Sequence, residues 1–164
     1  KEPAGVMVSD DEKVGIVLNG TDHIRIQLFA SGLHLDDLWN QASQIDDYIN
    51  ELYPYAFDDQ VGYLTTYPTN IGTGMRAYLV LHLALLDSVS RFDDMVDEIG
   101  RFGLKLKPAF SSDRQLNGNM YVLYNEKTLG TSEEHFAIIP LNSIGLRWRI
   151  SAIRHMVRFV IQSS

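Results

Sequence analysis

The 164-residue sequence contains no cysteine, which excludes disulfide bonds, cysteine-ligated metal sites and thiolate nucleophiles. It also lacks any apolar run close to the ~20 residues that a membrane-spanning helix needs. Its first residues, KEPAGVMVSDDEK, lack the apolar centre of a signal peptide. We therefore expect a soluble cytoplasmic protein with no membrane partner. Hydrophobic residues make up 45% of the chain, so we expect residues 1–164 to form a single domain around one core.

Positive charge is scarce over most of the chain. The net charge is −7, although the stretch from Arg147 onward holds four arginines and no acidic residue. Phosphate backbones attract proteins with an excess of cationic surface, so we expect no nucleic-acid partner. The basic C-terminal segment either docks on its own acidic domain or contacts an anion or an acidic partner, and both interpretations stay open.

Apolar spacing predicts a mixed α+β domain. Short apolar runs and alternating patterns predict strands at Val6–Val8, Val14–Leu18, 23–30, 77–83, Leu104–Lys107 and Met120–Leu123. Helical spacing predicts helices over Leu35–Leu52, 87–101 and roughly 146–162, with a further helix start at Ser132. Residues 55–78 are predicted to be a loop region that runs into the strand at 77–83. These elements fit a mainly antiparallel sheet with the helices on one face.

The run PTNIGTGMR at 68–76 carries the strongest chemical signal. Its two glycines and small hydroxyl residues let backbone N–H groups approach an anion, and Arg76 could clamp a phosphate with its planar fork. It is neither a P-loop nor a GxGxxG motif. The alternative is a plain tight turn that enters a strand.

Arg25 is a second candidate for binding an anion. It lies on the polar side of its predicted strand together with His23 and Gln27, while the alternative is an ordinary solvated strand face. No metal site is predicted, because the histidines show no i,i+3 or i,i+4 pairing and HExxH is absent. The residues themselves therefore predict an anion or nucleotide site built around Arg76 and Arg25.

Three blocks of sequence keep a common order and spacing between Val14 and Glu134. Residues 62–83, GYLTTYPTNIGTGMRAYLVLHL, are similar to GYLT-x-CPTN-x-GTG-x-RAS followed by a bacterial LHL. Residues 19–27, NGTDHIRIQ, resemble a strand that reads Asn-Glu-Glu-Asp-His-Leu-Arg. Residues 118–134, GNMYVLYNEKTLGTSEE, resemble Gly-Asn-Leu-Phe-x-x-Ser-Asn-x-x-Thr-Leu-Gly-x-Ser-Glu-Glu. These patterns resemble the ATP:guanido phosphotransferase family, its bacterial protein-arginine kinases most of all; residues 135–164 are a divergent, helical tail.

The resemblance implies the catalytic-domain fold of guanido kinases, which is related to that of glutamine synthetase. It also implies ATP or ADP with Mg²⁺ as the cofactor and phosphoryl transfer to a guanidinium nitrogen, a reaction that depends on positioning and electrostatics. Arg25, Arg76 and Lys107 match cations that bind phosphate in this family, and His82 matches the bacterial LHL segment. His82 is equally well interpreted as an ordinary strand residue.

Several positions that handle the guanidinium in this family are altered here. Gly20-Thr21 stands where the family has Glu-Glu, and Tyr67 replaces a reactive cysteine. Lys107-Pro108 replaces an Arg-Gly pair, which keeps the charge but loses the planar fork, and Ser112 occupies the position of a loop glutamate. The resemblance therefore implies no confident catalytic residue.

Three functions are consistent with this pattern. A pseudokinase would keep nucleotide or phosphate binding and act as a regulatory or binding partner, either with another protein or as a homo-oligomer. An active ATP-dependent protein-arginine or phosphagen kinase is the first alternative, and a structural module without nucleotide binding is the second. The changes at Thr21, Tyr67 and Ser112 affect guanidinium handling while the phosphate-binding cations remain, which favours the pseudokinase.

Overall fold

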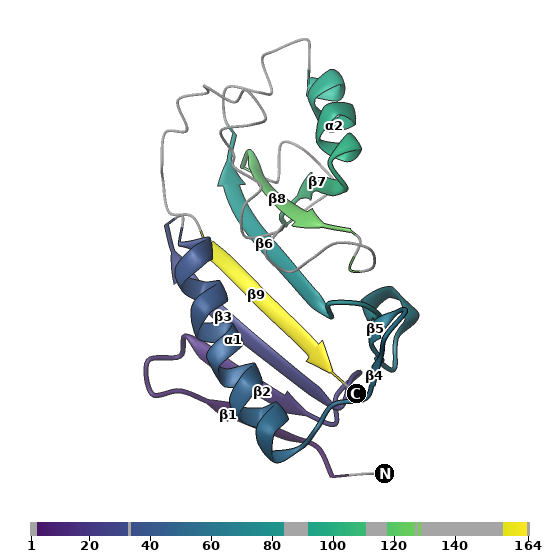
Figure 1. Cartoon of the computed structure of the whole chain (residues 1–164). Coiled ribbons are helices and arrows are strands. Elements are labelled where there is room, and N and C mark those ends of the chain that lie inside the picture. The colour runs from purple at the N-terminus through teal and green to yellow at the C-terminus, as the bar shows by residue number, and fades with distance from the viewer. Residues whose placement is uncertain are drawn as a thin grey trace.

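The computed structural model describes residues 3–32, 34–83, 92–110, 118–126, 128 and 156–163. Its main element is a seven-stranded sheet in the order β1-β2-β3-β9-β6-β8-β7, and every neighbouring pair is antiparallel (Figure 1). The strands are β1 (Gly5–Val8), β2 (Val14–Leu18), β3 (Ile24–Ser31), β6 (Met75–His82), β7 (Leu104–Pro108), β8 (Met120–Asn125) and β9 (Met156–Ser163). The other elements are helices α1 (Leu35–Leu52) and α2 (Phe92–Arg101), the short pair β4 (Phe57–Asp58) and β5 (Gly62–Tyr63), and the 3₁₀ turn η1 (Pro68–Asn70).

One face of the sheet carries the hydrophobic core. Strand side chains alternate between the two faces, and in β8 every second residue is buried, ending with Tyr121, Leu123 and Asn125 on the core side. The same alternation in β3 and β6 places Ile26 and Met75 in this core. The opposite face, which we call the open face, holds the polar members of the same strands.

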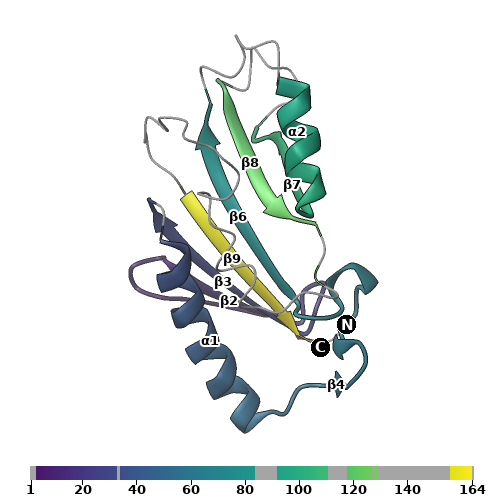
Figure 2. The same ribbon diagram turned by 45° about the horizontal axis from the view of Figure 1, so that its top comes forward.

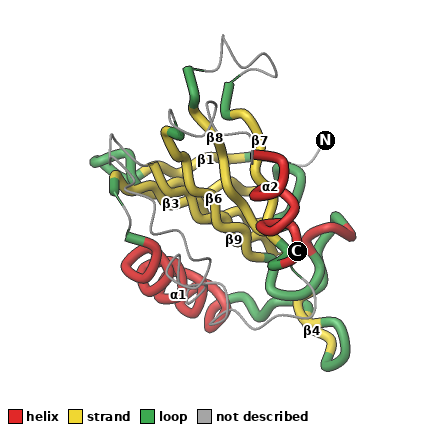
Figure 3. Tube along the Cα trace, turned by 90° about the horizontal axis from the view of Figure 1, so that it is seen from above, coloured by secondary structure: helices red, strands yellow, loops and turns green. Residues whose placement is uncertain are grey.

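The two described helices cover the core face. Leu38 and Ala42 of α1 and Ile99 of α2 join a single buried cluster with the apolar strand residues. Helix α1 packs along β3 and β9, and α2 packs along β7 (Figure 2). Viewed from above, α1 lies along one side of the sheet (Figure 3). Both helices thus pack on the core face, and among the described residues no α-helix covers the open face.

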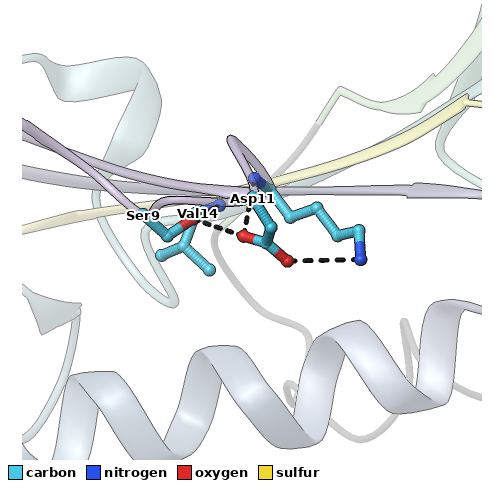
Figure 4. A network of polar contacts seen from close by, with 4 residues as sticks. Ser9, Asp11 and Val14 are labelled. Carbon is cyan, nitrogen blue, oxygen red and sulfur yellow. Dashed lines mark hydrogen bonds and ion pairs between the residues drawn. The ribbon is translucent and has the colours of Figure 1, made fainter.

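The turn between β1 and β2 is fixed by a polar network around Asp11 (Figure 4). Asp11 Oδ1 accepts hydrogen bonds from Ser9 Oγ at 2.7 Å and from the Lys13 backbone N–H at 3.2 Å, and Oδ2 lies 3.2 Å from Lys13 Nζ. Ser9 Oγ in turn accepts from the Val14 backbone N–H at 3.0 Å. These contacts, the Ser9 hydroxyl foremost, lower the pKa of the Asp11 carboxyl to about 2.

Most of the predicted elements are confirmed. The hairpin of β1 and β2, strand β3, helix α1 and strands β6, β7 and β8 all lie where the sequence predicts them, within two residues. Helix α2 begins at Phe92, and the predicted residues 87–91 lie outside the described residues. The predicted helix start at Ser132 also lies outside them. The region 55–78 is predicted to be a loop, whereas it contains β4, β5, η1 and the first residues of β6.

The helix predicted over roughly 146–162 is wrong at its C-terminal end. Residues 156–163 form strand β9, which pairs with β3 from Ile24↔Ser163 to Ser31↔Met156 and with β6 on its other side. The stretch VRFVI within β9 is rich in β-branched and aromatic residues, which favour strands. A strand here also provides hydrogen-bond partners for the backbone N–H and C=O groups of both β3 and β6, which a helix could not do. Residues 146–155 lie outside the described residues.

Candidate functional site

The four residues predicted to bind a cofactor lie on strands whose alternation places them on the open face. Arg25 belongs to β3, Arg76 and His82 to β6, and Lys107 to β7, each between neighbours that point into the core. Strand β9 separates β3 from β6, and its Gln162 and Val160 pair with Arg25 and Arg76 respectively. Strand spacing and this two-residue offset put the Cα atoms of the two arginines roughly 12 Å apart. The sheet therefore brings the two predicted arginines to one surface.

Arg76 is held by the loop that precedes its strand. Its Nη2 donates to the carbonyl oxygen of Thr69 at 2.9 Å, and its Nε lies 3.4 Å from Asn70 Oδ1. The hydroxyl of Thr128 donates to the same Thr69 carbonyl at 3.1 Å and to that of Ile71 at 2.8 Å, which ties the loop to the segment after β8. The loop therefore holds the Arg76 guanidinium in place.

The glycines in this region shape the loop through close backbone contact. Gly72 has φ 110° and forms an isolated bridge with Tyr63. Gly62 has φ 85°, and a Cβ atom there would lie 2.8 Å from the Gly72 carbonyl oxygen, so a side chain cannot be accommodated without a backbone shift. The loop is thus folded against β5 before the chain enters β6.

Backbone N–H groups of the loop contribute less to an anion site than the sequence suggests. The N–H of Asn70 donates to Tyr67 O, that of Gly72 to Tyr63 O, and that of Thr73 to Thr128 O. The Met75 N–H donates to Thr73 Oγ1. Because these groups are engaged within the protein, the positive charge of the site comes from side chains.

A buried polar relay connects Arg76 to the turn before β3. Asp22 is 2% exposed and Asn70 is 7% exposed, and the Asn70 amide donates to Asp22 Oδ2 at 3.2 Å. The other end of the Asn70 amide, Oδ1, faces Arg76 Nε. Burial and this contact give Asp22 a structural role, so it does not provide a carboxylate to a ligand on the surface.

Thr21 and Arg25, both singled out by the sequence, are in direct contact. Arg25 Nη2 donates to the Thr21 hydroxyl at 2.7 Å. Thr21 occupies a position where the resembling sequences carry a glutamate, and a hydroxyl provides neither the negative charge nor the basicity of a carboxylate. The contact fixes Arg25 beside a neutral group.

Arg76 also lines a cavity of about 580 Å³, within the range of roughly 300–1,000 Å³ that is typical of small-molecule sites. The cavity is lined by Pro68, Thr69, Ile71, Arg76, Tyr124, Glu126 and Thr128. Glu126 forms an ion pair with Lys105, and this pairing raises the pKa of the Lys105 ammonium. Arg76 and the Glu126 carboxylate, which is ion-paired with Lys105, therefore line the same cavity.

Other predicted residues lie apart from this cavity. His82 lies at the far end of β6, about 20 Å along the strand from Arg76 at the usual rise per residue. Tyr67 is half-exposed and caps η1 with its carbonyl, which accepts from the Asn70 N–H at 2.9 Å. Ser112 lies outside the described residues. Lys107 lies across β8 from β6, with its Nζ 5.2 Å above the centre of the Tyr124 ring.

Sequence reasoning did not single out the cavity residues of β8 and its C-terminal flank. Tyr124 and Glu126 lie on the open face because they alternate with the buried Asn125, whose amide donates to Met75 O and accepts from the Ala77 N–H. The pairing of β6 with β8 places Tyr124 beside Tyr78. The sequence predicts both strands but not which strands pair or in which register, so Tyr124 could not be singled out from it.

Metal ligation finds no support among the described residues. No group of three or more histidine, aspartate or glutamate side chains lies close enough to hold an ion in that part of the chain. Mg²⁺ in nucleotide enzymes is bound largely by phosphate and water oxygens, so a bound nucleotide would bring most of its ligands. Within the same residues, no helix is both long and apolar enough to cross a membrane.

The fold and this cluster of cations agree with a comparison to known families. The profile of the ATP:guanido phosphotransferase C-terminal catalytic domain matches residues 1–139, and the chain belongs to this family. The match includes the Val14–Glu134 stretch that carries the sequence resemblance and extends 13 residues before it and 5 residues after it. The family uses ATP, and its membership implies a nucleotide as ligand.

Curated relatives include protein-arginine kinases of staphylococci. The chain is 44% identical to that of Staphylococcus epidermidis over 135 residues, which is 82% of this chain and 40% of the relative. It is 42% identical to that of Staphylococcus haemolyticus, again over 82% of this chain and 40% of the relative. The chain thus spans about two-fifths of the length of these relatives.

Solved structures show the same fold. Lombricine kinase superimposes with a TM-score of 0.72 and 23% identity, covering 82% of this chain and 37% of that one. The duplicated taurocyamine kinase from Schistosoma mansoni gives a TM-score of 0.68 with 23% identity, covering 79% of this chain and 18% of that one. At this identity the comparison supports the fold alone.

Proposed function

We propose that this domain binds the phosphates of a nucleotide on its open face and does not itself transfer a phosphoryl group to a guanidinium. Arg25, Arg76 and Lys107 supply the positive charge, and ATP or ADP, with Mg²⁺ carried by its phosphates, is the expected ligand. The domain would then act as a regulatory or binding partner of another protein or of a second copy. Membership of the family supports the choice of ligand.

The contact between Arg25 and Thr21 carries the second half of this proposal. Phosphoryl transfer to a guanidinium nitrogen requires removal of a proton, and a positioned carboxylate accelerates such a step by about 10²–10⁴-fold. Thr21 offers a hydroxyl, 2.7 Å from Arg25 Nη2, at the position where the pattern of the resembling family has a glutamate. Asp22, the adjacent carboxylate, is buried and bonded to Asn70, so it is not positioned to replace it.

Binding of nucleotide separates this proposal from a purely structural module. Calorimetric titration of the chain with ADP should give saturable binding that weakens on Arg76→Ala and on Arg25→Ala. Arg101→Ala is a matched control, because Arg101 is an exposed arginine at the end of α2 and its removal changes the net charge equally. Absence of ADP binding by the wild-type chain would favour the structural module.

Activity separates the proposal from an active kinase. The chain is incubated with ATP, Mg²⁺ and either free arginine or an arginine-rich protein, and phosphoarginine is sought by mass spectrometry under alkaline conditions that preserve the P–N bond. We expect none above a no-protein blank. Phosphoarginine that depends on Arg76 would overturn the proposed loss of transfer and leave ADP binding intact.

A further inference from the structure

Two tyrosines form an aromatic pair on the open face beside the cavity. Tyr78 of β6 and Tyr124 of β8 are direct partners in the ladder, and their rings stack with centroids 5.7 Å apart and planes 20° from parallel. Both sequence patterns that define the family resemblance carry a small serine at these positions. In this chain two bulky rings take those positions and pack against each other, as cross-strand aromatic pairs do.

Lys107 of β7 contacts this pair diagonally across the ladder. In the ladder of β7 and β8, Lys107 pairs with Val122, whereas Lys105 is the residue opposite Tyr124. Nevertheless the Lys107 ammonium lies 5.2 Å from the Tyr124 ring centre. The contact is therefore diagonal across the ladder, and Tyr124 lies about 7 Å along β8 from Val122, toward the end of the sheet where Arg76 lies.

Tyr124 is the residue that connects Lys107 with the cavity. Its side chain lines the cavity together with Arg76, and the Lys107 ammonium lies over the face of its ring. An exposed lysine without such a partner samples many rotamers, so the ring reduces the entropy that would be lost on binding an anion. The attraction between the Lys107 ammonium and the face of the Tyr124 ring holds the lysine on the side of β8 that leads to the cavity.

We propose that Tyr124 is a positioning residue of the phosphate site, whose ring holds Lys107 toward the Arg76 cavity so that both cations act on one polyphosphate. This inference rests on the proposed function and deepens it. It assigns the site to ligands with at least two linked phosphates, such as a nucleoside diphosphate or pyrophosphate. A single phosphate at Arg76 makes no use of Lys107.

Pyrophosphate and inorganic phosphate are suitable probes for titration of the full chain. Tyr124→Leu and Lys107→Met should each weaken pyrophosphate binding by about two- to five-fold, the worth of an exposed cation–π contact. The double variant should bind no more weakly than Lys107→Met, because Tyr124 acts only through Lys107. Tyr124→Phe keeps the ring and should bind as the wild type does, and inorganic phosphate should respond to none of these changes.

A spectroscopic measurement follows the lysine itself. Ring current should shift the Lys107 ε-methylene protons upfield in the wild type and in Tyr124→Phe, and this shift should vanish in Tyr124→Leu. Lys107→Met is a surface change that leaves the tyrosine pair intact, so the titration stays informative if Tyr124→Leu unfolds.

The outcomes separate the two proposals. Wild-type binding of pyrophosphate that is unchanged by Lys107→Met overturns the role of Tyr124 and Lys107 but keeps nucleotide binding. Additive losses in the double variant, or no upfield shift, also overturn it. A wild-type chain that binds neither pyrophosphate nor ADP overturns both proposals.

Discussion

The side-chain amide of Asn70 donates a hydrogen bond to the buried carboxylate of Asp22 at 3.2 Å, although the two residues are far apart in sequence. This contact joins the turn before β3 to the loop before β6, and therefore the two segments that carry Arg25 and Arg76. It lies in a nearly solvent-free environment, with Asp22 2% exposed. Hydrogen bonds to charged groups in such places contribute more than those at the surface.

Asp22→Ala should lower the free energy of unfolding by about 1–3 kcal/mol, because it removes a buried acceptor of the Asn70 amide. Urea denaturation followed by circular dichroism measures the loss. Asp59→Ala, a change of the same kind in an exposed turn, should alter stability by less than about 0.5 kcal/mol. Equal effects of the two substitutions would show that the Asp22–Asn70 contact contributes little.

Thr21→Glu should weaken ADP binding by about two- to five-fold, because a carboxylate beside Arg25 competes with phosphate for its guanidinium. The present 2.7 Å contact shows that position 21 is within reach of Arg25. Thr21→Gln has the same length without the charge and should bind ADP nearly as the wild type does. A loss that is the same for both variants would indicate crowding, and the electrostatic interpretation would then be wrong.

Glu126→Gln should strengthen ADP binding by about two- to five-fold. The carboxylate of Glu126 faces the same cavity as Arg76 and engages Lys105, so its removal deletes a negative charge and releases a positive one. The gain should shrink as salt is raised, since the charges are exposed to solvent. Glu98→Gln on the outer side of α2 is the control, and calorimetry at two salt concentrations gives the comparison.

The carboxyl of Asp11 should titrate with a pKa of about 2, lower than that of an unfolded aspartate. Its contribution to the β1–β2 turn is therefore present above the unfolded value and is lost as pH falls through the folded one. Carbon-detected NMR of the side-chain carboxyl during acid titration measures the midpoint. Ser9→Ala removes the largest cause and should raise that midpoint, whereas an unchanged midpoint would contradict the assignment of the Ser9 hydroxyl as the main cause.

The sequence predicts the local elements well because their signals are local. Helix α1 follows from the spacing of apolar residues such as Leu38 and Ala42, and β3 follows from the alternation around Ile26. Arg25 and Arg76 could be predicted as partners because each lies on a polar strand face next to a distinctive turn. Which strands pair, and in which register, could not be predicted in the same way, because register depends on the whole core and not on any one segment.

The features that sequence reasoning missed are all products of such pairing. Tyr124 becomes important only because β8 lies between β6 and β7, which brings Tyr78 to one side of it and Lys107 to the other. The strand character of residues 156–163 was missed for a related reason. An apolar segment with scattered arginines suits either a helix or a strand, and the two neighbouring edges of β3 and β6 decide between them.

The position of β9 has a kinetic consequence. It is the only described strand that lies beyond the stretch matched by the family profile, yet it occupies the middle of the sheet and pairs Ile24 with Ser163. Contacts between residues so distant in sequence form slowly, because a long loop must close before they contribute. Strands β1 to β3 and the group β6, β7 and β8 can each pair locally at an early stage. Arg25 and Arg76 reach their final separation only when β9 docks between them, so phosphate binding should be among the last properties to appear during folding.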